Sequence, residues 1–230
     1  MDLRGWVRTS LIDYPEHIAT VLFTGGCDFR CPMCHNADLV LRPGELPPVS
    51  EDDVWAFLSR RAGLVDGIVV TGGEPTIQAD LLPFLRRARA QRVDIKLDTN
   101  GYQPDVLARL LEERLVDAVA MDVKAPLAKY PRLAGRADLD LGRLERSMAL
   151  LRESSVRYEF RTTVVPGLLD VEDVEEIARW IAGAARYVLQ PFRPVGTLDP
   201  ALASVRPYPR ERLQAMAAVA QQWVDEVVVR

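Results

Sequence analysis

The chain has 230 residues, of which 48% are hydrophobic and 27% charged, and its formal net charge is −4. This composition is typical of a globular protein with a buried core, and the acidic balance argues against a protein whose main task is to grip nucleic-acid phosphates. We expect one domain, residues 1–230, slightly short for a complete eight-stranded α/β barrel, which takes ~250 residues.

Neither the start of the chain nor its apolar runs indicate membrane association. The first six residues, MDLRGW, lack the basic start and the apolar run of a signal peptide. No apolar stretch is long enough to cross a bilayer. We therefore expect a cytoplasmic protein with no membrane and no nucleic-acid partner, in a reducing compartment that keeps thiols free.

Short apolar or β-branched runs alternate with amphipathic segments along the chain, and they predict strands and helices respectively. The predicted strands cover residues 18–24, 67–71, 93–98, 116–123, 156–165 and 187–192. The predicted helices cover residues 50–61, 79–92, 104–113, 139–154, 171–182 and about 210–224, before a short apolar end. Two helix starts carry capping signals: Ser50, with Asp53 as a capping-box partner, and Asp170.

Strands that alternate with helices predict βαβ units and a parallel sheet, which is an α/β fold. Right-handed crossovers curl such a sheet in one direction. Because six strand–helix units are fewer than the eight of a closed barrel, we expect a partial, laterally open (β/α)6 barrel of parallel strands. A flat doubly wound sheet is the alternative, since the pattern alone does not separate the two.

The three cysteines of the chain lie in one short stretch directly after the first predicted strand. Cys27, Cys31 and Cys34 have the spacing Cys-x-x-x-Cys-x-x-Cys. An odd, clustered set indicates metal chemistry or a reactive thiol rather than disulfides. A loop this short can bring three thiolates to three corners of a cubic iron–sulfur cluster and leave the fourth iron open, unlike the four-cysteine clusters of electron transfer. An open iron can bind a substrate, as an open catalytic zinc site does.

A zinc site of three cysteines and one histidine is the alternative. The chain has two histidines, His17 and His35. His35 directly follows Cys34, and adjacent residues rarely point at one small ion. His17 precedes the first predicted strand, so its position relative to the cysteines is open.

The cysteine spacing, together with the run GWVRTSLIDYPEHIATVLFTGGCDFRCPMCHN, resembles radical S-adenosylmethionine enzymes. Within them it is similar to glycyl-radical-activating enzymes, particularly those of anaerobic ribonucleoside-triphosphate reductases. The resemblance covers most of the chain. It implies a [4Fe-4S] cluster on the three cysteines and S-adenosyl-L-methionine at the open iron. Met33, where the family commonly has an aromatic residue near the adenine, and His35 join the expected cofactor-binding residues.

The segment Gly72-Gly73-Glu74 ends the second predicted strand. Two glycines let a backbone approach a ligand closely, and a carboxylate can accept from an ammonium group. In the resembling family this segment contacts the amino group of the methionine moiety. Taken alone, the glycine pair also fits a simple turn or a weak phosphate loop.

Two further motifs end the third and fourth predicted strands. Asp98 and Asn100 can hydrogen-bond a ribose diol, or they can form an Asx turn before a glycine with positive φ. Asp122 and Lys124 match an Asp-x-Lys that contacts S-adenosylmethionine in the resembling enzymes, where the lysine suits the methionine carboxylate. A salt-bridged pair at a barrel rim is the other interpretation.

Alternation on the fifth predicted strand places Glu159, Arg161 and Thr163 on one face. Arg161 can hold a carboxylate of the ligand, as the family's arginine near this point implies, or neutralise Glu74 or Glu159 in the core. All these motifs fall at or near the C-terminal ends of predicted parallel strands, where barrel active sites are assembled. Arg193 stands where some pyruvate formate-lyase activating enzymes have a histidine, and its role is open.

The resemblance implies reductive cleavage of S-adenosylmethionine and generation of a glycyl radical on a partner enzyme, with an anaerobic ribonucleotide reductase as the first candidate. It also implies a flavodoxin- or ferredoxin-type electron donor. A radical S-adenosylmethionine enzyme acting on a small molecule, like the deazapurine synthases, is the second hypothesis. A non-catalytic zinc or redox-sensing module is the third.

Overall fold

The computed structural model describes all residues, 1–230, and its strands form one eight-stranded sheet in the sequential order β1 to β8. β1 pairs with β2 in antiparallel fashion, and every other neighbouring pair is parallel. The strands are β1 Leu3–Ser10, β2 Ala19–Thr24, β3 Gly67–Gly72, β4 Asp94–Thr99, β5 Ala118–Asp122, β6 Arg157–Val164, β7 Tyr187–Pro191 and β8 Val227–Val229.

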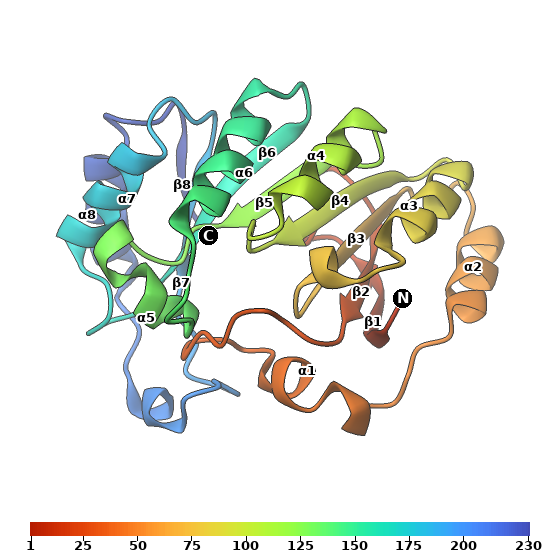
Figure 1. The fold of residues 1–230 in the computed structure, drawn as a ribbon, viewed down its shortest axis with the longest axis horizontal. Coiled ribbons are helices and arrows are strands. Elements are labelled where there is room, and N and C mark those ends of the chain that lie inside the picture. The colour runs from red at the N-terminus through yellow and green to blue at the C-terminus, as the bar shows by residue number, and fades with distance from the viewer.

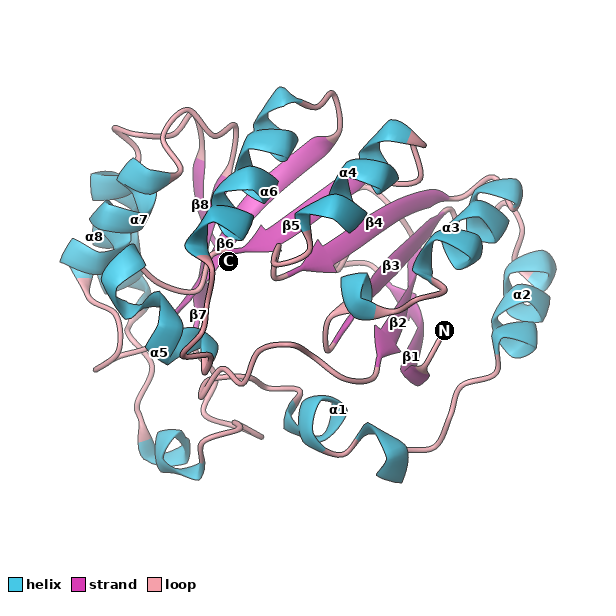
Figure 2. Cartoon of the chain, viewed as in Figure 1, coloured by secondary structure: helices cyan, strands magenta, loops and turns pink.

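The sequential order decides between the two predicted architectures. Right-handed crossovers between strands that follow one another in space place their helices on one face of the sheet, whereas a doubly wound sheet reverses direction at a switch point. Figure 1 shows α3, α4, α6, α7 and α8 along the outer side of the curved sheet, and Figure 2 shows the strands within this layer. Because β1 does not pair with β8, the sheet is not closed. The predicted open barrel is confirmed, with β2 to β7 as its six expected strands.

The longer helices follow the predicted order. They are α2 Glu51–Arg60, α3 Leu81–Ala90, α4 Pro104–Glu112, α6 Leu141–Glu153, α7 Val171–Trp180 and α8 Arg210–Ala220. At α7 the predicted cap is complete, because Asp170 and Asp173 each accept the backbone N–H of the other. At α2 only half of the predicted capping box forms: the Ser50 hydroxyl accepts the N–H of Asp53 at 3.4 Å, and no reciprocal bond is present.

The sequence patterns did not reveal the two edge strands or the shortest helices. β1 and β8 each have one neighbouring strand, so much of their surface stays half-exposed and neither is a continuous buried apolar run. The two short helices are α1 Ala37–Leu41 and α5 Tyr130–Ala134, and the 3₁₀ turns are Pro43–Glu45, Pro75–Ile77, Leu127–Lys129 and Pro200–Ser204. A single helical turn carries too few residues to establish a period.

The core lies between the sheet and the outer helices. On α3, for example, Leu81, Leu85 and Ala88 are fully buried at spacings of four and three, so one face of the helix packs on the strands. Three buried charged side chains, Lys96, Glu159 and Arg161, lie instead on the strand faces away from this layer. No helix in the structure has the length and apolarity that crossing a bilayer requires.

Candidate active site

A cavity of about 220 Å³ lies at the C-terminal ends of β2 to β6. Parallel strands end at the same edge of a sheet, so their terminal residues and following loops meet there. Every predicted site residue lines this cavity: Cys27, Cys31, Met33, Cys34, His35, Gly72, Gly73, Glu74, Asp98, Asn100, Asp122, Lys124 and Arg161. The wall is completed by Thr163, which the sequence analysis placed on one face with Arg161, and by five residues that it did not single out: Phe29, Asn36, Val40, Thr71 and Thr99.

The glycine pair after β3 lets two loops touch. The N–H of Glu74 donates to the carbonyl of Gly26 at 2.8 Å, just before the cysteines. A side chain at Gly73 would place its Cβ 1.8 Å from that same carbonyl oxygen, and Gly72 has φ of +113°. The glycines therefore allow the loop after β3 to approach the cysteine loop. The fold itself needs them for this contact, apart from any ligand.

The three cysteines are free thiols on one loop. The N–H of Cys34 donates to the carbonyl of Cys31 at 3.0 Å, and the N–H of Phe29 donates to Cys27 Sγ at 3.4 Å. Burial raises the pKa of Cys31 to about 11 and raises the pKa of Cys27 further, with Glu74 adding to the effect. Burial therefore favours the protonated form of these two thiols, and a bound cation would hold them as thiolates.

The donor set fits an iron–sulfur cluster better than one zinc ion. No three His, Cys, Asp or Glu side chains lie close enough together to hold a single ion, whereas three thiolates on one zinc would be ~3.8 Å apart. A cubic cluster spreads its ligands over separate corners. His17, the other candidate ligand, lies at the opposite end of the sheet, with Nε2 3.0 Å from Asp94 at the start of β4.

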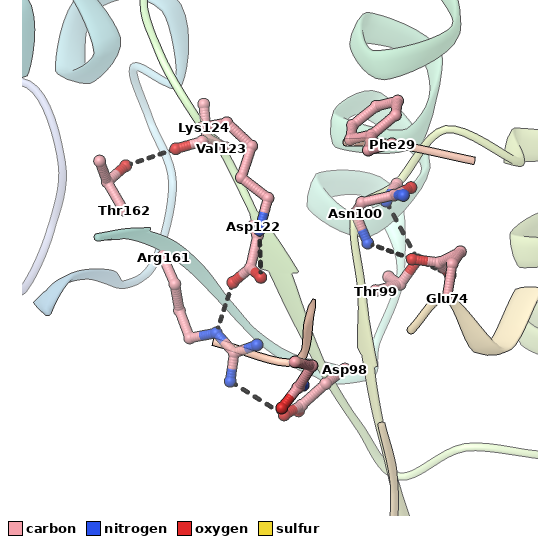
Figure 3. A network of polar contacts seen from close by, with 12 residues as sticks. Phe29, Glu74, Asp98, Thr99, Asn100, Asp122, Val123, Lys124, Arg161 and Thr162 are labelled. Carbon is pink, nitrogen blue, oxygen red and sulfur yellow. Dashed lines mark hydrogen bonds and ion pairs between the residues drawn. The ribbon is translucent and has the colours of Figure 1, made fainter. Parts of the chain in front are cut away.

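Glu74 joins the ends of β3 and β4. Its carboxylate accepts hydrogen bonds from the N–H and hydroxyl of Thr76 at 3.0 and 2.5 Å. It also accepts the Thr99 hydroxyl and the N–H of Asn100, both at 2.7 Å (Figure 3). Complete burial raises the pKa of Glu74 to about 7, although these hydrogen bonds favour the carboxylate. One oxygen, Oε2, accepts a single bond and can accept a second.

The Asn100 side chain forms hydrogen bonds within the protein. Its Nδ2 donates to Asp28 Oδ1 at 2.7 Å, and its Oδ1 accepts the N–H of Tyr102 at 2.9 Å. The second contact closes an Asx turn, and Gly101, with φ of +74°, is its central residue. The alternative interpretation of this motif as a turn is therefore present in the structure.

Five alternating charges run across β4, β5, the loop after β5 and β6, and Figure 3 labels four of them: Asp98, Arg161, Asp122 and Lys124. Asp98 pairs with Lys96 and, at 3.1 Å, with Arg161 Nη1. Asp122 lies 2.8 Å from both Arg161 Nε and Lys124 Nζ. Three cations and two carboxylates leave one net positive charge. Against the effect of burial, Arg161 and Lys124 lower the pKa of Asp122 to about 2, so this carboxyl group is ionised at neutral pH.

The sequence analysis considered Glu74 and Glu159 as partners of Arg161, and the structure gives it two others. It bridges Asp98 and Asp122, and it forms no ion pair with Glu74 or Glu159. Glu159 instead accepts from Arg230 Nη2 at 2.7 Å. The pairing was not predictable from the strand alone, because Arg161 faces Asp122 in the register of β5 and β6 while Asp98 comes from β4.

A second cavity of about 470 Å³ adjoins the first and shares four of its residues: His35, Asp98, Arg161 and Thr163. Its other walls come from the β1–β2 loop, from β4, from the end of β7 and the segment after it, and from the residue after β8. The residues are Ile12, Asp13, Lys96, Gln190, Pro191, Arg193 and Arg230. The cavity therefore takes residues from both ends of the open sheet. Ile12 is its one large apolar side chain.

The sequence analysis did not identify two polar residues of the site, Lys96 and Asp28. Lys96 alternates with Asp98 along β4, so the period of two already places both on one face. Asp28 lies inside the cysteine motif, but its contacts with Asn100 and Gln103 join residues more than 70 positions apart. Such contacts have no local signal.

Comparison with known proteins gives one family match and two relatives that span most of the chain. A sequence model described as the Radical SAM superfamily matches residues 21–181. A protein of Methanocaldococcus jannaschii, assigned by name to the glycyl-radical enzyme activating enzymes, is 35% identical over 98% of this chain and 94% of its own length. The pyruvate formate-lyase 1-activating enzyme of Escherichia coli strain K12 is 26% identical, over 92% of each chain.

Among solved structures, Streptococcus suis SuiB bound to S-adenosylmethionine has a TM-score of 0.65 at 15% sequence identity. The match covers 89% of this chain and 48% of that one, so the chain spans about half the length of SuiB. At this identity the likeness concerns the fold, and it agrees with the incomplete barrel described above.

Proposed function

Because this chain belongs to the radical SAM superfamily and to its glycyl-radical enzyme activating enzymes, we propose that it generates a glycyl radical on an anaerobic ribonucleotide reductase. Enzymes of this superfamily use a [4Fe-4S] cluster and S-adenosylmethionine, and the protein acted on is a glycyl-radical enzyme. The observation that carries the proposal is the shared cavity, in which the cysteine loop meets four strand-end motifs beside a larger polar cavity.

The cysteines are the cluster ligands in this proposal. Cys27, Cys31 and Cys34 would hold three irons, and Met33 and His35 lie on the same loop beside them. When bound, the two cofactors supply the electron and the 5′-deoxyadenosyl radical for hydrogen abstraction. The protein's own task is to orient the cofactor and to exclude water from the cavity.

The polar walls suit the parts of S-adenosylmethionine. The net positive charge shared by Lys124 and Arg161 suits the methionine carboxylate. Gly72, Gly73 and the free acceptor position on Glu74 suit the amino group. Asp98 suits the ribose hydroxyls, and Asn100 supports that wall through its bond to Asp28.

The second cavity suits a substrate that is a peptide backbone. Its lining offers hydrogen-bonding groups and a single large apolar side chain, Ile12, so it favours a glycine and its amides over a large apolar residue. Because its lining comes from both ends of the open sheet, a loop of a partner protein can enter between them. The proposal treats residues 1–230 as one domain, because both cavities draw on β-strands from across the whole sheet.

The remaining parts of the proposal concern the setting. Reduced free thiols are typical of the cytoplasm, which we propose as the place of action. A flavodoxin- or ferredoxin-type protein is the proposed electron donor, since one low-potential electron is needed for each cleavage.

Electron spin resonance tests this function directly. The anaerobically reconstituted protein is incubated with dithionite, S-adenosylmethionine and an anaerobic ribonucleotide reductase. We expect a glycine-centred doublet, and we expect Cys31→Ser to abolish it together with the iron content. Release of 5′-deoxyadenosine with a small molecule alone, and no doublet with any glycyl-radical enzyme, would favour the small-molecule hypothesis. Zinc without iron or sulfide would contradict both enzyme hypotheses.

A further inference from the structure

Asp28 lies between Cys27 and Phe29 in the cysteine loop, and the proposed function uses it only as a hydrogen-bond partner of Asn100. Both of its carboxylate oxygens accept hydrogen bonds from the loop after β4. Asn100 Nδ2 donates to Oδ1 at 2.7 Å, and Gln103 Nε2 donates to Oδ2 at 2.8 Å. The carboxylate therefore joins two loops that are far apart in the sequence.

The two amide donors are themselves fixed. Gln103 Oε1 accepts from Arg143 Nη2 at 2.8 Å, and Arg143 Nε donates to the carbonyl of Tyr102, also at 2.8 Å. The guanidinium of Arg143 lies 4.7 Å from the centre of the Tyr102 ring. Asn100 is held by its Asx turn and by its N–H bond to Glu74. Because each donor has a second anchor, Asp28 is clamped in one position.

The clamp reaches the sulfur of Cys27. Asp28 Oδ1 and Asn100 Nδ2 each lie 3.9 Å from Cys27 Sγ, while the N–H of Phe29 lies 3.4 Å from it. A negative charge and two N–H donors thus surround one sulfur. Charge and hydrogen bonds at the ligand sulfurs are among the factors that set the reduction potential of an iron–sulfur cluster.

We propose that Asp28 is a positioning residue that, clamped by Asn100 and Gln103, fixes Cys27 and lowers the reduction potential of the cluster through its charge. This inference rests on the proposed function, because it takes Cys27 as a cluster ligand. An added electron on the cluster is repelled by a fixed carboxylate beside the sulfur, so the reduced form is less stable than it would be beside a neutral side chain. A more negative potential makes the reduced cluster a stronger electron donor.

Two variants separate the charge from the clamp. Gln103→Ala removes one of the two hydrogen bonds and keeps the charge. Asp28→Asn also keeps one bond, since its amide oxygen still accepts from Asn100 while its NH₂ cannot accept from Gln103, but it removes the charge. Asp38→Asn is the matched control, because it removes an exposed carboxylate of α1 that pairs with Arg42, the residue after this helix.

Each protein is reconstituted without S-adenosylmethionine and titrated electrochemically while absorbance and spin resonance are recorded, with iron and sulfide measured in parallel. We expect the potential of Asp28→Asn to shift positively relative to Gln103→Ala, and that of Asp38→Asn to equal wild type. We expect a chelator to remove iron faster from both Asp28→Asn and Gln103→Ala than from the control.

Equal potentials in all four proteins would overturn the electrostatic role, and equal chelator rates would overturn the clamp. If Asp28→Asn does not fold, Asp28→Ser removes the same charge with a smaller side chain. Failure of wild type itself to assemble a cluster would contradict the proposed function instead, so the two failures are distinguishable.

Discussion

At the residue scale, Glu74 is the most enclosed acidic side chain of the site. The residue as a whole is 1% exposed, and its carboxylate accepts four hydrogen bonds from Thr76, Thr99 and Asn100. Burial disfavours its charge, whereas the hydrogen-bond donors favour it. The result is a carboxyl group that titrates near neutral pH in the folded protein.

The stability of the apo-protein should depend on pH through Glu74. Its pKa rises from 4.5 in the unfolded chain to about 7 in the folded protein, so between these values the folded state binds more protons. The free energy of unfolding therefore falls as the pH rises through this window, by about 3 kcal/mol, and levels off above it. Urea denaturation of wild type and Glu74→Gln from pH 4.5 to 8 measures this, because the glutamine does not titrate. Parallel pH profiles would contradict the assignment.

The residue types at the site were accessible from the sequence, but their contacts were not. The cysteine spacing and the Gly72-Gly73-Glu74 segment indicated which side chains to expect. Nothing local indicated that Gly73 faces the Gly26 carbonyl, or that the amide of Asn100 is used by Asp28. Such contacts depend on how loops pack across the end of the sheet.

At the element scale, three neighbouring strands share one chain of charges. Asp122 and Arg161 are direct neighbours in the register of β5 and β6, and Asp98 reaches the same guanidinium from β4. Arg161 is 9% exposed, so its charge has little access to water. Removing it would leave two carboxylates close together and without their shared cation.

Replacement of this arginine should be far more harmful than replacement of another on the same strand. Arg161→Met is expected to lower the free energy of unfolding by about 3 to 5 kcal/mol, because it breaks a buried ionic network. Arg157→Met is the control, since Arg157 lies on the same face of β6 but pairs with Glu16 in the solvent, where an ion pair contributes under ~1 kcal/mol. Urea denaturation at pH 7 compares the two. Equal losses would show that the network does not stabilise the strand ends.

At the scale of the whole molecule, the sheet has two unpaired edges, because its first and last strands do not pair with each other. β8 has three residues, all half-buried and paired only with β7, while β3, β4 and β5 have neighbours on both sides and are largely buried. The same gap that leaves these edges unpaired is where the second cavity takes its walls from Ile12, Arg193 and Arg230. Access to the site and weak edge pairing are thus two results of one open architecture.

Hydrogen exchange should reflect this difference. Backbone amides of β3 to β5 are expected to exchange only through global unfolding, and those of β8 through local opening that needs much less free energy. A difference of roughly 100-fold or more in exchange rate is expected between the two sets. Exchange followed by NMR in deuterated buffer measures it residue by residue. Uniform protection from β1 to β8 would contradict an open sheet with weak edges.

The sequence by itself determined the order of the six inner strands and the six longer helices, the cysteine spacing and the position of each polar motif at a strand end. These are local properties, set by periodicity and by spacing along the chain. The tertiary structure decided that the sheet is singly wound and open, that two edge strands extend it, and that Arg161 bridges Asp98 and Asp122. It alone also joined Asp28 to Asn100 and Gln103. Strand pairing and side-chain contacts between distant segments depend on packing in space, which no local pattern of residues specifies.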